Sequence, residues 1–219
     1  MSVPVKPNKS PKEKLLETAL SQMKVTSDSG FTDAKSGQLA NEADNGDGQH
    51  KDKNRKVKFR PFRDERDLPD IMAMMERDLS EPYSVYTYRY FLMQWPNLSF
   101  LAYDPDTKKN IGAIICKHDS ALQRGYIAML AVDPEYRRLG VASSLVTHAC
   151  EAMKQYNCKE VGLETEATNK KALGLYTKLG FIREQRMKNY YLNGGDAFQL
   201  RLLLPYNDVR FQWDERLIA

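Results

Sequence analysis

One stretch of the sequence, from Ile127 to Tyr156, restricts the possible folds more than any other. Ile127–Val132 is almost continuously apolar, which is typical of a buried strand. A short turn with two arginines and Gly140 follows, and from about Val141 the apolar residues recur with the spacing of one helical face. A buried strand that leads directly into a long amphipathic helix predicts an α/β fold.

Alternating strand and helix patterns continue on both sides of this stretch. We expect helices after Asp67 as an N-cap, between Ser84 and Pro96, and over 170–178. Strands are expected at 57–62, 98–103, 111–117, 161–165, 181–187 and 198–203. The order predicts a mixed α/β sheet with flanking helices over residues 55–204.

Composition separates this domain from the two ends of the chain. Residues 1–54 carry as many lysines as acidic residues and a single aromatic, Phe31, so we expect a disordered tail there and a C-terminal extension over 205–219. The net charge of +4 is too small to make nucleic acid the expected partner. No apolar run approaches the roughly 18 residues that a membrane span needs, so a soluble, cytoplasmic protein is expected.

The turn before the long helix has the chemistry of a phosphate site. Unpaired N–H groups and the positive end of the helix dipole meet there, and Arg137 and Arg138 add charged donors. The glycine spacing of a P-loop or of a dinucleotide fingerprint is absent. A capping glycine beside surface arginines is the alternative interpretation.

The turn resembles the pyrophosphate motif of the GNAT N-acetyltransferases, and the next helix resembles that family's following motif. More narrowly, several segments resemble NatC-type N-terminal acetyltransferases, namely 78–84, 88–91, 124–127, 163–166 and 190–193. The resemblance implies a central sheet splayed between the strands that end at Val132 and Thr165. Acetyl-CoA would lie in that gap as co-substrate, held by Leu130, Ala131, Val132, Arg137, Arg138, Leu139, Gly140, Val141, Ala142, Asn169 and Tyr176.

Acetyl transfer to an amine needs a proton acceptor and a donor for the departing thiolate. Glu164 is an ionisable residue in an otherwise apolar strand, which is costly unless it is partnered or faces a wet cleft. The resemblance implies Glu164 as the base, directly or through water, and Tyr176 as the donor. Pairing of Glu164 with a nearby cation and simple helix packing of Tyr176 are the alternatives.

The resemblance also implies the substrate and the partners. Glu81, Tyr83, Tyr190 and Tyr191 resemble peptide-site residues, and the implied substrates are nascent chains that start with Met and a large hydrophobic residue. A large auxiliary subunit, a small Sm-like subunit and indirect contact with the ribosome are implied as well. An acetyltransferase acting on lysines or small amines, and a non-catalytic acetyl-CoA-binding module, remain alternatives.

Neither a metal site nor a cysteine nucleophile is expected. His148 and Cys150 are two residues apart on an expected helix and therefore point to different faces. Cys116 lies in an apolar strand without an evident base beside it. Direct acetyl transfer is therefore the preferred chemistry.

Overall fold

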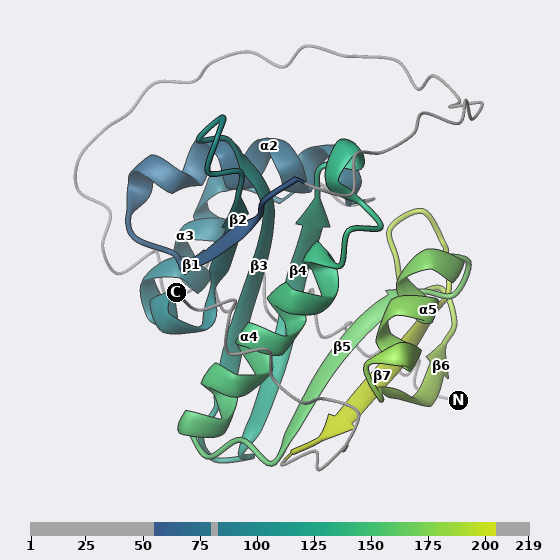
Figure 1. Ribbon diagram of the computed structural model, residues 1–219. Coiled ribbons are helices and arrows are strands. Elements are labelled where there is room, and N and C mark those ends of the chain that lie inside the picture. Colours follow the sequence, from purple (N-terminus) through teal and green to yellow (C-terminus); the bar gives the residue numbers. More distant parts are fainter. Residues whose placement is uncertain (1–54, 80–82, 205–219) are drawn as a thin grey trace, which may run out of the picture. The chain divides into compact units, whose positions relative to one another are not determined.

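The computed structural model describes residues 55–79 and 83–204 (Figure 1). Its sheet has seven strands in the order β1-β2-β3-β4-β5-β7-β6, and β4 with β5 is the one parallel pair among them. The strands are β1 (Lys58–Pro61), β2 (Phe100–Tyr103), β3 (Asn110–Asp119), β4 (Arg124–Val132), β5 (Glu160–Glu166), β6 (Ile182–Met187) and β7 (Ala197–Leu203). The expected mixed α/β architecture is confirmed.

Four α-helices cover this sheet within the described residues: α2 (Leu68–Asp78), α3 (Val85–Gln94), α4 (Val141–Gln155) and α5 (Lys170–Lys178). Helices α2 and α3 lie on one face, whereas α4 and α5 lie on the other (Figure 1). Side chains from α4, α5 and the central strands form one buried cluster. Gly125 allows α4 to approach β4 closely, since a Cβ there would lie 2.3 Å from the Met153 sulfur.

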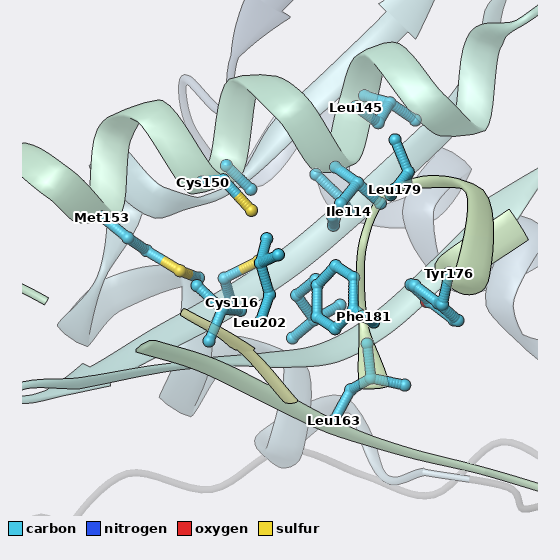
Figure 2. Close-up of a cluster of buried hydrophobic side chains, with 14 of the residues drawn as sticks. Ile114, Cys116, Leu145, Cys150, Met153, Leu163, Tyr176, Leu179, Phe181 and Leu202 are labelled. Atoms are coloured by element: carbon cyan, nitrogen blue, oxygen red, sulfur yellow. The ribbon is translucent and has the colours of Figure 1, made fainter. Parts of the chain in front are cut away.

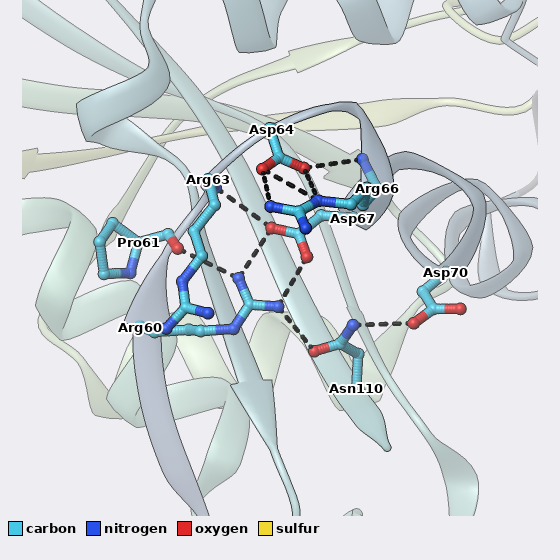
Figure 3. A network of polar contacts seen from close by, with 8 residues as sticks. All are labelled: Arg60, Pro61, Arg63, Asp64, Arg66, Asp67, Asp70 and Asn110. Atoms are coloured by element: carbon cyan, nitrogen blue, oxygen red, sulfur yellow. Dashed lines mark hydrogen bonds and ion pairs between the residues drawn. The ribbon is translucent and has the colours of Figure 1, made fainter. Parts of the chain in front are cut away.

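Asp67 precedes α2 as expected. It occupies the N-cap position of the helix, but its side chain makes no capping hydrogen bond. Its carboxylate instead accepts two bonds of 2.7 Å from the guanidinium of Arg60 on β1 (Figure 3). The expected N-cap position is therefore confirmed, while a charged bidentate partner from another element occupies the carboxylate.

Strands β4 and β5 separate soon after they begin. Their pairing is confined to three residues of each strand and ends at Tyr126 opposite Gly162. Beyond that point β4 stays paired with β3, and β5 stays paired with β7. The sheet is thus splayed between these two strands, as Figure 1 shows, and none of the described strands pairs with β4 along the edge that faces the gap.

A bulge in β4 lies just beyond the point of separation. Ile115 of β3 pairs with Met129, and the next residue, Cys116, pairs with Ile127, so Ala128 is the extra residue. A bulge of this kind bends the strand and redirects its side chains. None of the helices in the described residues is both long and apolar enough to cross a membrane.

Candidate active site

Glu164 lies on β5, two residues beyond the last pair that joins this strand to β4. Its half-buried carboxylate accepts a hydrogen bond of 2.5 Å from the Tyr126 hydroxyl. The side-chain amide of Gln199, the register partner of Glu164 on β7, lies at 3.5 Å from the other carboxylate oxygen. Contacts from two strands therefore hold the carboxylate at the edge of the gap.

Tyr126 was not identified as a site residue from the sequence. Burial raises the pKa of its phenol well above the ordinary value, and the negative charge of Glu164 raises it further. The phenol therefore remains protonated and donates to the carboxylate. The strand pattern places Tyr126 on β4, but its meeting with Glu164 depends on a sheet order that local sequence does not specify.

The aromatic residues expected at the peptide site divide into two groups. Besides burial and Glu164, Tyr190 and Tyr83 also raise the pKa of Tyr126, so both phenols act electrostatically on its hydroxyl. Tyr191 is buried and packs edge-to-face against Tyr190, with 5.1 Å between the ring centroids. Glu81, the acidic member of the expected set, lies outside the described residues.

Arg137, the first arginine of the expected phosphate turn, is held by the protein itself. Its Nε donates a hydrogen bond of 2.9 Å to the carbonyl of Val132, and a terminal guanidinium nitrogen lies 2.8 Å from the carboxylate of Asp78 on α2. Asp78 also accepts a bond of 2.9 Å from Arg77. The side chain therefore links β4 to α2 as well as contributing positive charge to the turn.

Arg138 and Gly140 give the turn its shape. Arg138 is exposed and has φ +68°, while Gly140, the N-cap of α4, has φ +83°. Such angles favour glycine, and a Cβ at Gly140 would meet nothing within 4 Å. Among the described residues no side-chain hydrogen bond caps α4, and the N–H groups of a helix's first turn have no acceptor within the helix.

The other residues of the expected cofactor site have side chains that pack in or against the core. Val141 is part of the buried cluster, and Leu139, Ala142 and Leu130 pack against it. The N–H of Asp133 donates a hydrogen bond of 2.8 Å to the carbonyl of Ile111 on β3. Because successive residues of a strand point to opposite edges, the N–H and C=O of Ala131 also face β3, whereas those of Leu130 and Val132 face the gap.

Tyr176 of α5 lies in the buried cluster (Figure 2). It is 5% exposed and packs edge-to-face on Phe181, with 5.3 Å between centroids. Burial raises the pKa of its phenol, so the hydroxyl is a neutral donor. Asn169 is the N-cap of α5, and its side-chain oxygen accepts a bond of 3.0 Å from the Ala172 N–H.

The three cysteines are unsuited to nucleophilic catalysis. Cys116, Cys150 and Cys158 are free and buried. Burial raises the pKa of Cys116 well above the ordinary value and that of Cys150 to about 12, so both are thiols at neutral pH. Within residues 55–79 and 83–204, no group of three or more His, Cys, Asp or Glu side chains could hold a metal ion.

These features combine into a site with two chemical ends. At one end, a splayed strand edge, a helix N-terminus and exposed positive charge suit an extended ligand with phosphate groups. At the other end, a carboxylate held by a phenol can accept a proton. These are the requirements of an acyl-transfer enzyme that uses a phosphate-containing thioester.

Comparison with known proteins agrees with this arrangement. Residues 68–181 match the family described as "Acetyltransferase (GNAT) family". The chain belongs to this family. The relatives described next belong to one group, the N-alpha-acetyltransferases.

Two relatives carry the same name, N-alpha-acetyltransferase 30. The one from Homo sapiens is 52% identical over 153 residues, a match that covers 68% of this chain and 42% of the human protein. The one from Saccharomyces cerevisiae is 46% identical over 160 residues and is covered to 90%. The chain thus spans less than half of the human relative but nearly all of the yeast one.

A solved structure gives the corresponding result in three dimensions. It is described as "Crystal structure of the NatC complex bound to Gag peptide and CoA", and its similar chain is 46% identical with a TM-score of 0.66. The match covers 68% of this chain and 99% of that one. The GNAT fold expected from the sequence is therefore confirmed.

Proposed function

We propose that this protein is the catalytic subunit of a NatC-type N-terminal acetyltransferase. It transfers acetyl from acetyl-CoA to the α-amine of nascent chains that start with Met followed by a large hydrophobic residue. The observation that carries the proposal is the position of Glu164, held by Tyr126 where β4 and β5 separate. The 46% identity to a chain of the NatC complex supports the assignment of the substrate class.

Acetyl-CoA occupies the gap in this proposal. Its pantetheine arm pairs with the backbone of Leu130 and Val132, and its pyrophosphate binds the first turn of α4 together with Arg138. Asn169 contributes at the start of α5. Arg137 contributes charge from its position between Asp78 and the Val132 carbonyl.

The chemical step is a direct transfer. Glu164 takes a proton from the α-ammonium, directly or through water, and the neutral amine attacks the thioester carbonyl. The positively charged nitrogen of the tetrahedral intermediate then loses its second proton to water. When the C–S bond breaks, Tyr176 gives its proton to the leaving thiolate and is reprotonated from solvent. Its raised pKa supports this role because the phenol keeps its proton until the thiolate forms.

An α-amine is the substrate best matched to this site. With a pKa near 7.7 to 8.0, it is about 10% neutral at pH 7, whereas a lysine side chain is only about 0.04% neutral. Glu81 and Tyr83 orient the ammonium and the peptide backbone, while Tyr190 and Tyr191 line the pocket for the second side chain. Aromatic rings supply both apolar surface and hydroxyl groups for such a pocket.

The proposal extends to the setting of the enzyme. A large auxiliary subunit and a small Sm-like subunit complete the complex, which acts at the ribosome in the cytoplasm. Direct contact with nucleic acid or membrane is not part of the proposal. The tail expected over 1–54 and the extension expected over 205–219 lie outside the described residues.

The test compares peptides that differ only in the acceptor amine. The purified protein, alone and with auxiliary subunits, should acetylate Met-Leu peptides faster than Met-Lys peptides, and both faster than N-terminally blocked peptides containing lysine. Glu164→Gln is the matched inactive control. Faster acetylation of the lysine side chain would favour the lysine alternative, and acetyl-CoA binding without turnover in either setting would favour a scaffold module.

A further inference from the structure

Lys117 lies beside the pair formed by Tyr126 and Glu164. It is a half-buried residue of β3 and the direct register partner of Tyr126. Its ammonium nitrogen is 5.4 Å from the centroid of the Tyr126 ring. The three side chains therefore form a continuous row across β3, β4 and β5, with the phenol between a cation and a carboxylate.

The surroundings of Lys117 are unusual for a lysine. Burial lowers its pKa, which is the cost of placing a charge in a poorly hydrated position. Two carboxylates act in the opposite direction: Asp119 on its own strand and Glu164 on β5. Tyr126 is the titratable group that faces it from β4, and Tyr83 and Tyr190 in turn act on Tyr126.

The positive charge of Lys117 affects the protonation of an amine that binds near it. Positive charge disfavours the protonated, positive form of an amine and favours the ionised form of a carboxyl group. The effect on the amine acts in the direction that acetyl transfer requires, because only the neutral amine attacks the thioester.

We propose that Lys117 is a positioning residue for the proton transfer, whose ammonium favours the neutral form of an α-amine bound beside Glu164. This inference rests on the proposed function. Glu164 alone would hold the substrate as an unreactive ammonium ion, because a carboxylate stabilises the charged form of an amine. Lys117 offsets that attraction from the far side of the Tyr126 ring.

The pH profile of kcat on a Met-Leu peptide tests the proposal. Lys117→Met keeps a long side chain but removes the charge, so the acid limb should move to higher pH by about half to one unit. The rate on that limb should fall roughly three- to tenfold, with the same plateau at high pH. Lys117→Arg keeps the cation and should retain the wild-type limb.

Lys154→Met is the matched control. It also replaces a partly buried lysine, but one on α4 whose ammonium pairs with Glu151. Its profile should be that of the wild type. An unmoved acid limb in Lys117→Met, or an equal loss at every pH in both Lys117→Met and Lys117→Arg, would overturn the proposal.

A second measurement does not depend on turnover. Because the carboxylate of Glu164 raises the pKa of Lys117, Glu164→Gln should lower that pKa further, as followed by NMR of the lysine side chain. An unchanged lysine titration contradicts the inference even if the enzyme is active. A wild-type protein that binds acetyl-CoA and transfers nothing to α-amines contradicts the proposed function instead.

Discussion

The hydroxyl of Tyr126 donates a hydrogen bond of 2.5 Å to the carboxylate of Glu164 across the point where β4 and β5 separate. Beyond this point β4 pairs with β3 and β5 pairs with β7, and the two strands no longer pair with each other. The hydrogen bond therefore spans the gap between them. Together with the Gln199 amide at 3.5 Å, it fixes the direction of the carboxylate. The orientation of the proposed base thus depends on a residue from the neighbouring strand.

Replacing Tyr126 by Phe should therefore lower kcat without unfolding the protein. A hydrogen bond to a charged group contributes about 1.5 to 3 kcal/mol, which corresponds to a loss of roughly 10- to 100-fold. Affinity for acetyl-CoA should change little, because the phosphate turn lies at the other end of β4. Steady-state kinetics with calorimetric titration of acetyl-CoA measures both, and an unchanged kcat would remove Tyr126 from the site.

The elements with strong local signals were predicted well from the sequence. Helix α5 spans 170–178 as expected because Asn169 caps it, and α4 begins at Val141 because Gly140 adopts the left-handed angle before it. Those signals lie within a few residues of the helix that they define. Strand β4 begins at Arg124, three residues before the expected start, because its first residues are recognised only by pairing with β3 and β5.

The contacts that the sequence did not reveal are long-range. Tyr126 and Glu164 are separated by 38 positions and meet through the sheet order. The ion pair between Asp78 and Arg137 joins α2 to the turn before α4, and no periodicity or motif relates these two positions. Sequence patterns thus identified the residue types of the site, whereas the partners that orient them required the fold.

Arg137 and Arg138 should respond differently to substitution by alanine. Arg138 is exposed, so Arg138→Ala should weaken acetyl-CoA binding by about 1.5 to 3 kcal/mol for a charge-assisted bond and leave the melting temperature unchanged. Arg137→Ala also breaks the links to Asp78 and to the Val132 carbonyl, and should lower both affinity and stability. Calorimetry and thermal melting separate the two effects. Wild-type affinity in both variants would contradict the phosphate-site assignment.

The acid stability of the domain should depend on Asp104. A hydrogen bond of 2.5 Å from the Tyr136 hydroxyl is the main cause that lowers the pKa of this carboxyl to about 2. Its unfolded value is about 3.9, so its contribution is complete above that pH and is lost as pH falls from about 4 to 2.

Tyr136→Phe removes this donor and brings the folded pKa of Asp104 closer to the unfolded value. The variant should therefore be less stable than the wild type at pH 7, and the difference should narrow as the pH approaches 2. Urea unfolding at a series of pH values measures it. A difference in stability between the two proteins that stays constant with pH would show that the Tyr136 hydroxyl does not act through the charge of Asp104.

Tyr176→Phe separates the donor role from packing. The ring and its contact with Phe181 remain, so the fold should be kept, while kcat should fall by roughly 10² to 10⁴ if the phenol protonates the thiolate. Raising the pH should not restore the rate, because alkaline solution supplies no acid. A thioester with a more acidic leaving thiol should restore part of it. Equal losses for both thioesters would indicate a structural role for the hydroxyl.

Glu164→Gln should show the opposite pH response. The amide keeps the size of the side chain but cannot take a full proton, so kcat at neutral pH should fall by roughly 10² to 10⁴ with little change in acetyl-CoA affinity. The fall is smaller where solution already supplies neutral α-amine, since about 10% is neutral at pH 7. Raising the pH increases that fraction and should recover part of the rate of Glu164→Gln.

The decisive data are paired pH profiles of the wild type and Glu164→Gln on one Met-Leu peptide, under conditions where chemistry limits the rate. Full activity of folded Glu164→Gln at neutral pH would leave amine deprotonation to bulk water and reduce the role of the pair with Tyr126 to holding the sheet.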